Sequence, residues 1–174
     1  FAPPNENQKN PPSTYLPFKI HQFISQTGTV YTSLHRGEDR AILLEPASYA
    51  EVNGKTVNVF PVVFSRTSGH QMICVTRNDE TGIFHPREFR EASEEEENLR
   101  DGYLIPENNP EDPLWNPGTD LECLPSSWVS TDRSGKTKAT KQYQNRLPLE
   151  VFYDGDGHFS TSPAPGLDFR GWFM

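Results

Sequence analysis

The sequence predicts a mostly β, α+β fold: antiparallel sheets of short strands and hairpins, one acidic helix and long proline-rich loops. Short segments rich in β-branched and aromatic residues recur along the 174-residue chain, and turn pairs such as Asn53-Gly54 separate them. Sixteen prolines and an apolar fraction of 33% indicate a compact domain with many loops. One Glu-rich segment interrupts the series of short strands and predicts the helix.

The chain divides into a short arm and one domain. Residues 1–14 are rich in Pro, Asn, Gln and Ser, which predicts a flexible N-terminal arm. Residues 15–174 have the length and composition of a single globular domain. Because no run of about 18 apolar residues occurs, we expect no membrane-spanning segment.

The strands are predicted from local patterns. Asn53-Gly54 lies between two β-rich arms within 49–66, and this pair is the preferred two-residue hairpin turn. Further strands are predicted within the segments 15–25, 28–36, 40–47, 70–79 and 147–160.

The helix is predicted between Pro86 and Gly102. Pro is favoured at the first helical position and Gly just past the end. Phe89, Ala92 and Leu99 would share one face of it, with the Glu run on the other. Beyond it, we expect an irregular proline-rich stretch at 105–128 and a polar loop at 130–146.

The net charge of −8 comes from one segment. Residues 88–112 contain ten acids and two arginines, so the rest of the chain is neutral. Nucleic-acid binders usually carry a basic stripe, and the cluster from Arg133 to Arg146 has the composition of a solvated loop. A nucleic-acid partner is therefore not expected.

The segment "YDGDGHFS", Tyr153 to Ser160, admits two interpretations. Asp154 and Asp156 match the first two ligand positions of a calcium loop. His158 occupies the third position, where a hard cation prefers oxygen, and no Glu follows. Asp-Gly pairs also favour hairpin turns, so we predict a turn and no metal. Because phosphate-binding, dinucleotide-binding and zinc motifs are missing from the sequence, we expect no cofactor.

The enzymatic alternative is a ribonuclease-like hydrolase. The order of a Glu, an Arg and a His along successive strands resembles the small guanyl-type ribonucleases of fungi, which cleave RNA by acid–base chemistry. The Tyr-Pro-His segment of that family is absent, and two cysteines cannot form its usual pair of disulfides. The candidates are Glu45 as base, Arg66 or Arg77 for the phosphate, His85 or His70 as acid, and His35 as a second base.

The binding interpretation rests on aromatic residues in proline-rich or terminal segments, where large rings often anchor partners. These are Trp115, Trp128, Trp172 and Phe173. The same rings also suit a role in covering the core. A protease inhibitor is a further alternative, since the loop from Ile105 to Trp115 is proline-rich, although it shows no reactive-site pattern.

The two cysteines leave two possibilities open. A disulfide between Cys74 and Cys123 would close a loop of about 50 residues and stabilise the fold by about 4 kcal/mol in the chain-entropy model. Two free thiols are the alternative. Neither cysteine has the neighbours of a zinc site.

The layout resembles the small secreted effector proteins of plant-pathogenic fungi such as the smuts. The features that carry it are the start "FAPPNENQKNPP", the two cysteines, the Asn-Gly and Asp-Gly turns, and Gly171-Trp172-Phe173 near the end. The resemblance implies secretion to the extracellular space or translocation into host cells. It also implies non-catalytic binding of a host protein without a cofactor, and it transfers no site residues.

Overall fold

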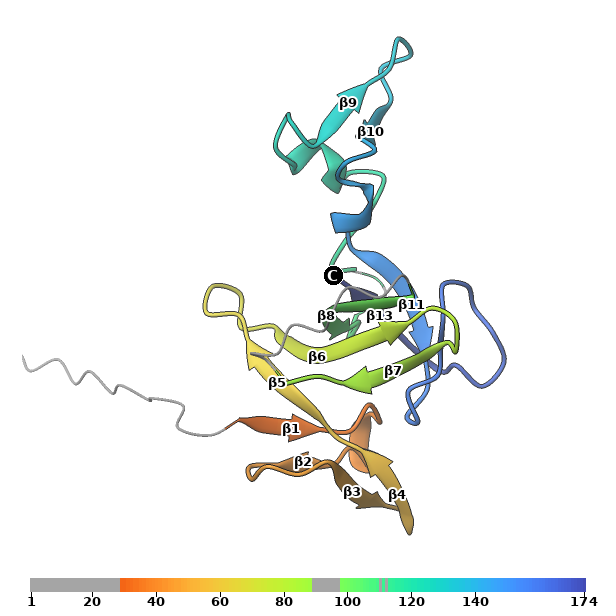
Figure 1. Ribbon diagram of the computed structural model, residues 1–174. Helices are drawn as coiled ribbons and strands as arrows, with labels where there is room; N and C mark the ends of the chain where they lie inside the picture. Colours follow the sequence, from red (N-terminus) through yellow and green to blue (C-terminus); the bar gives the residue numbers. More distant parts are fainter. Residues whose placement is uncertain (1–28, 89–97, 110, 112) are drawn as a thin grey trace, which may run out of the picture.

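The computed structural model describes residues 29–88, 98–109, 111 and 113–174, and in these ranges the chain forms strands β1 to β13 with three short 3-10 helices (Figure 1). The strands are β1 (Val30–Thr32), β2 (Ile42–Leu43), β3 (Tyr49–Val52), β4 (Lys55–Asn58), β5 (Phe60–Phe64), β6 (Gln71–Asn78), β7 (Ile83–Pro86), β8 (Leu99–Pro106), β9 (Val129–Thr131), β10 (Thr137–Ala139), β11 (Leu149–Tyr153), β12 (Phe159–Ser160) and β13 (Phe169–Phe173). The 3-10 helices are η1 (Gly37–Asp39), η2 (Asp120–Cys123) and η3 (Gln144–Arg146).

Nine strands form one antiparallel sheet, in the order β12-β11-β13-β8-β6-β5-β1-β2 with β7 also paired to β6. The long strand β6 is central, because β8 pairs along one of its edges while β5 and β7 share the other. Two-stranded sheets β3–β4 and β9–β10 lie outside it. The predicted antiparallel, mostly β architecture is confirmed.

The sheet curls until β7 meets the β11–β12 hairpin. The amide of Phe84 donates to the Gly157 carbonyl at 2.8 Å, and the amide of Phe159 donates to the Gly82 carbonyl at 2.8 Å. The Phe84 side chain is fully buried and stacks on the Phe159 ring, with centroids 4.4 Å apart. These contacts join segments far apart in the sequence and enclose the core.

The core consists of side chains from six strands of the large sheet and from the loop after β1. Burial of such aliphatic and aromatic surface is the main driving force for folding. The buried members are Leu34, Phe60, Val62, Ile73, Val75, Phe84, Leu104, Val151, Tyr153 and Phe173.

Both predicted hairpin turns are present. Asn53 and Gly54 join β3 to β4 with φ angles of 51° and 75°, the geometry that this pair adopts readily. In the Tyr153 to Ser160 segment, Oδ1 of Asp154 accepts the amides of Asp156 and His158. Oδ2 of Asp154 lies 2.8 Å from Nδ1 of His158. The carboxylate therefore organises the turn that brings the β11–β12 hairpin to β7.

The predicted acidic helix is not borne out. Pro86 ends β7 and Gly102 lies within β8, while residues 89–97 lie outside the described residues. No helix of seven or more residues occurs in the described ranges. Gly102 serves close packing instead, because a Cβ there would lie 2.4 Å from the carbonyl oxygen of Met174.

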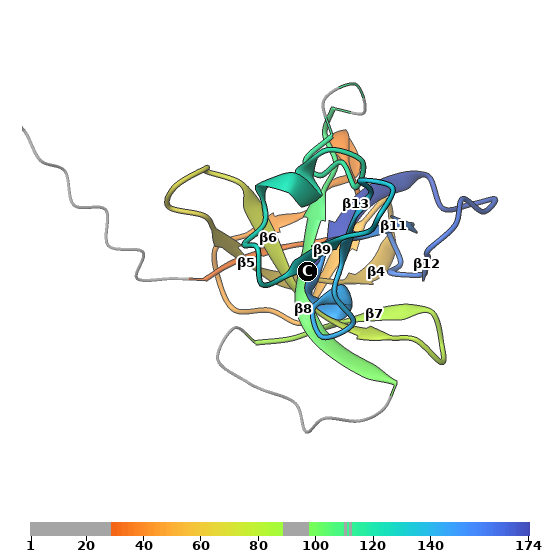
Figure 2. The same ribbon diagram turned by 90° about the horizontal axis from the view of Figure 1, so that it is seen from above.

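The segment 130–146, predicted as a polar loop, contains most of the β9–β10 hairpin. Thr131 pairs with Thr137, and Asp132 closes the turn by accepting hydrogen bonds from Ser134 and Lys136. This part of the chain projects from one end of the body in Figure 1, and Figure 2 looks down onto it.

Two further expectations concern the first residues and membranes. The predicted arm, residues 1–14, and the strand predicted within 15–25 lie outside the described residues. In the described part of the chain, no helix is both long and apolar enough to cross a membrane.

Candidate anion-binding site

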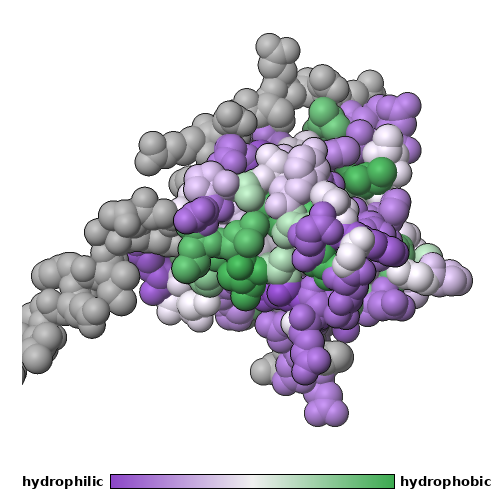
Figure 3. Space-filling model, turned by 90° about the horizontal axis from the view of Figure 1, so that it is seen from below, coloured by the Kyte–Doolittle hydropathy of each residue, from purple (hydrophilic) through white to green (hydrophobic). Residues whose placement is uncertain are grey.

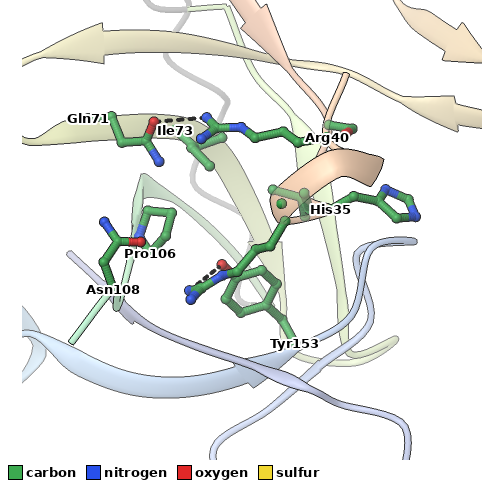
Figure 4. Close-up of a pocket in the computed structure, with 11 residues that line it drawn as sticks. His35, Arg40, Gln71, Ile73, Pro106, Asn108 and Tyr153 are labelled. Carbon is green, nitrogen blue, oxygen red and sulfur yellow. Dashed lines mark hydrogen bonds between the residues drawn. The ribbon is translucent and has the colours of Figure 1, made fainter. Parts of the chain in front are cut away.

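A cavity of about 190 Å³ opens where β6 and β8 separate (Figure 4). The pairing of these two strands stops at Ile73 and Leu104, while β8 continues to Pro106 alongside β13. The cavity is lined by the loop after β1, by the start of β6, by the end of β8 and by Tyr153 of β11. We call it the arginine cavity, and its lining residues are Ser33, Leu34, His35, Arg36, Gly37, Arg40, Gln71, Ile73, Pro106, Asn108 and Tyr153.

Arg36 is fixed by neutral oxygen atoms. Its Nη1 donates to the carbonyl of Glu107, and its Nη2 donates to the carbonyl of Arg170 at 2.6 Å and to the Tyr153 hydroxyl at 3.1 Å. The guanidinium carbon also lies 5.5 Å from the centroid of the Phe169 ring. Its Nε is buried without a hydrogen-bond partner among the described residues. The charge of Arg36 is therefore well positioned, but no carboxylate in the described ranges forms an ion pair with it.

Arg40 lies on another wall of the same cavity. Its Nε donates to the hydroxyl of Thr32 at 2.7 Å, and its Nη2 donates to the side-chain carbonyl of Gln71 at 2.8 Å, as the dashed line in Figure 4 shows. No described residue accepts a hydrogen bond from its Nη1. Burial lowers the pKa of Arg40, and the nearby charge of Arg36 acts in the same direction.

Neither guanidinium forms an ion pair with a described carboxylate. Glu107, whose backbone carbonyl accepts from Arg36, has a buried side chain that is already engaged. Its carboxylate accepts the indole N–H of Trp172 and the amides of Asn109 and Leu114. Two like charges beside a cavity, without counterions, favour the binding of an anion, because partly buried charges are costly unless they are paired.

Tyr153 adds a neutral hydrogen-bonding group. Burial raises the pKa of Tyr153, although the charge of Arg36 and its hydrogen bond act in the opposite direction. The phenol therefore remains protonated at neutral pH, and its oxygen accepts from Arg36. Its O–H stays available as a donor. Guanidinium and hydroxyl donors that converge on one cavity suit a carboxylate or a phosphate.

The residues of the ribonuclease alternative are not brought together. His85 pairs with Thr76 across β6 and β7, whereas Arg77 pairs with Phe84. Directly paired residues share a face and successive residues alternate, so Arg77 and His85 point to opposite faces of the sheet. Arg77 lies 4.7 Å from the Phe173 ring centroid and is paired with Asp79.

The other members of that constellation lie elsewhere. Arg66 and His70 are exposed in the β5–β6 loop. That loop ends where β6 begins, at Gln71. His85 pairs with Thr76, which lies five residues, or about 17 Å, further along β6. Glu45 is exposed between β2 and β3. His35 points away from Arg40 and Gln71 in Figure 4 and packs over Gly155, where a Cβ would lie 2.3 Å from its Nε2.

The predicted binding aromatics separate into two groups. Trp172 and Phe173 are only 2% and 7% exposed, which fits the alternative that these rings cover the core. They belong to β13, which pairs with β11 on one edge and with β8 on the other. Trp128 is half-buried and stacks on Tyr143, with centroids 4.7 Å apart, and Trp115 is half-buried as well.

Other apolar side chains are exposed instead. Figure 3 views the face at the bottom of Figure 1, where a patch of apolar surface lies among polar residues. Such side chains cannot be singled out from sequence, because side chains alternate between the two faces of a strand and the pattern does not show which face is buried. The large exposed apolar residues are Ile42, Leu44, Tyr49, Phe64 and Met174.

The expected disulfide is not formed. Cys74 is buried in β6, Cys123 is exposed at the end of η2, and both are free thiols. Burial raises the pKa of the Cys74 thiol, so this side chain behaves as a small core residue.

Arg36 and Arg40 are not among the site residues that the sequence pattern predicted. They flank the acidic pair Glu38 and Asp39, so the segment 36–40 has no net charge and does not show a basic cluster in the sequence. Both acids are exposed, and Asp39 accepts a hydrogen bond from Asn53 instead of pairing with an arginine. No family model, no curated protein and no solved structure matches this chain.

Proposed function

We propose that this chain is a secreted, non-catalytic binding protein that captures an acidic group of a partner protein in the arginine cavity. The observation that carries the proposal is the pair Arg36 and Arg40, which share one cavity without a described carboxylate partner. Secretion and a host protein as partner rest on the layout of the sequence. No site residue of a known family contributes to the argument.

Binding is favoured over catalysis by what surrounds the two arginines. Their contacts within the protein are carbonyl, hydroxyl and amide oxygens, which hold a cation in place. The nearest histidine, His35, points away from Arg40. Acid–base catalysis requires a group within hydrogen-bonding reach of the proton it moves, and the candidates Arg77 and His85 lie on opposite faces of the sheet.

The proposal predicts that small anions stabilise the protein through Arg40. At a concentration ten times its Kd, acetate or phosphate should raise the free energy of unfolding by about 1.4 kcal/mol, or Tm by about 3–5 °C. Thermal unfolding would be followed by circular dichroism at constant ionic strength, with chloride as the reference anion. Arg40→Gln should remove the shift, and Arg40→Lys should retain part of it.

The matched control is Arg133→Gln, which removes an exposed arginine from the β9–β10 turn. Equal anion-induced shifts in the wild type and in Arg40→Gln would show that the stabilisation does not come from the cavity, and the proposal would fail. Metal-independent cleavage of RNA that is lost in His85→Ala would show an enzyme instead of a binding protein.

A further inference from the structure

A second cavity lies next to the arginine cavity. It measures about 300 Å³ and shares Gln71, Pro106 and Asn108 with the arginine cavity. Because the same three residues line both spaces, the two cavities adjoin, and we call the pair of them the groove. The remaining lining residues of its second part are Phe64, Ser68, Gly69, His70 and Ile105.

The groove follows from the pairing of the strands. β6 begins at Gln71, but β8 pairs with it only from Ile73, while the end of β8 turns to β13 through Ile105 and Pro106. The loop between β5 and β6 forms the rim, and the amide of Ser65 donates to the His70 carbonyl at 2.9 Å. The space is therefore bounded by well-paired strands on both sides.

The two parts of the groove differ in chemistry. The first contains both guanidiniums. The second is lined by the apolar residues Phe64, Ile105 and Pro106 and by neutral polar ones, and among its described lining residues only His70 can carry a charge. Phe64 is 48% exposed at the end of β5, although it is a large aromatic residue. An occupant that satisfies both parts carries an anionic group next to an apolar one.

We propose that the groove binds an extended acidic peptide segment of the partner, with a carboxylate between Arg36 and Arg40 and a nearby apolar side chain against Phe64. This inference rests on the proposed function and specifies its ligand. In an extended chain, side chains two residues apart lie on the same side at a spacing of about 7 Å, which suits adjoining subsites. A nucleic acid suits the groove less well, because Phe64 and Pro106 line the part next to the arginines and the chain carries a net charge of −8.

Three capped pentapeptides test the inference on the full-length protein. Gly-Glu-Gly-Leu-Gly and its reverse, Gly-Leu-Gly-Glu-Gly, carry both groups, and Gly-Glu-Gly-Gly-Gly carries the acid alone. Titration of ¹⁵N-labelled protein gives the Kd of each from amide chemical shifts. The better of the two Leu peptides should bind about tenfold tighter than the acid-only peptide, since a leucine side chain leaves water.

Variants separate the two parts of the groove. Phe64→Ser should abolish the difference between the Leu and Gly peptides, whereas Arg40→Gln should weaken every Glu-containing peptide. Leu44→Ser is the matched control, because Leu44 is 76% exposed and does not line the groove. It should leave all three Kd values unchanged.

The possible failures are distinguishable. If all three peptides bind equally and still depend on Arg40, the anion site stands and the apolar subsite is refuted. If anions stabilise the protein but no peptide shifts an amide at millimolar concentration, the peptide ligand is refuted. If neither anions nor peptides respond to Arg40→Gln, the proposed function fails together with the groove.

Discussion

Arg36 and Arg40 differ in how many of their N–H groups the protein uses. Arg36 donates to two backbone carbonyls and to Tyr153, so it links the loop after β1 to β11 and to the residues that follow β8. Within the described part of the chain, Arg40 donates only to Thr32 and Gln71, and its Nη1 has no acceptor there. Arg36 therefore holds the shape of the cavity, whereas Arg40 has donors left for a ligand. For this reason Arg40 is the position to substitute.

Glu107 links the arginine cavity to the core, because its backbone carbonyl accepts from Arg36 and its carboxylate accepts from Trp172. Burial acts to raise the pKa of Glu107, but hydrogen bonds from Trp172, Leu114 and Asn109 and the charge of Arg170 outweigh it, so the pKa is lowered overall. A carboxyl group whose pKa is lower in the folded protein than in the unfolded chain stabilises the fold at any pH above its pKa in the unfolded chain. That stabilisation is lost as the pH falls through the pKa that the group has in the folded protein.

The first residue-scale prediction concerns this carboxylate. Glu107→Gln should lower the free energy of unfolding at pH 7 by about 1–3 kcal/mol, because a charged acceptor of three hydrogen bonds becomes neutral. The difference from the wild type should shrink as the pH falls through the lowered pKa of Glu107 in the folded protein, because the wild-type carboxyl then becomes protonated as well. Urea unfolding of both proteins at a series of pH values measures this difference in the free energy of unfolding.

The exposed Glu80 provides the control, since Glu80→Gln should leave stability within about 0.5 kcal/mol at every pH. A constant difference between Glu107→Gln and the wild type from pH 7 to pH 3 would contradict the assignment of the lowered pKa to Glu107.

At the scale of elements, local rules predicted the hairpins well. Asn53-Gly54 and the Asp-Gly pairs after Tyr153 specify their turns through residues that tolerate positive φ or cap the turn with a carboxylate. Such signals depend on neighbours in sequence and need no knowledge of the rest of the fold. The strands that flank these turns were found for the same reason.

The predicted helix shows where local rules fail. Pro86 and Gly102 suited the two ends of a helix, but both lie in strands paired to β6, opposite Val75. The pairing partner is supplied by a distant part of the chain, and the pattern within the segment does not contain it. A glycine is needed at position 102 because the C-terminal residues Phe173 and Met174 pack closely against it. The sequence around Gly102 does not show this contact.

This role of Gly102 gives the second prediction. Gly102→Ala should destabilise the protein by about 1–3 kcal/mol, because the new Cβ would lie 2.4 Å from the Met174 carbonyl oxygen and 2.6 Å from an atom of the Phe173 ring. Chemical denaturation measures the change. Gly118→Ala, in an exposed loop, should change stability far less. Equal effects of the two substitutions would contradict the close packing of β8 against the C-terminal residues.

At the scale of the whole molecule, the site depends on closure of the sheet. The arginine cavity combines the loop after β1, the start of β6, the end of β8 and Tyr153, which are separated by up to about 120 residues. The composition and the strand pattern predicted the fold class. They could not predict which strands pair or where two of them separate, and the site arises from that separation.

The charge of the molecule also shapes the site. The chain carries a net charge of −8, so long-range electrostatics oppose the approach of an anion. Binding at Arg36 and Arg40 therefore depends on short-range hydrogen bonds inside the cavity. The affinity for small anions should accordingly be modest and specific to groups that fit between the two guanidiniums.

The most direct test of the central claim is to observe the two guanidiniums during a titration. The Nε–Hε resonances of Arg36 and Arg40 can be followed by ¹⁵N NMR while acetate is added at constant ionic strength, with Arg133 as an internal reference. Saturating shifts with one common Kd at Arg36 and Arg40, and no shift at Arg133, are the predicted result. Resonances that stay unchanged, or that drift in parallel with Arg133, would show that the cavity does not hold an anion.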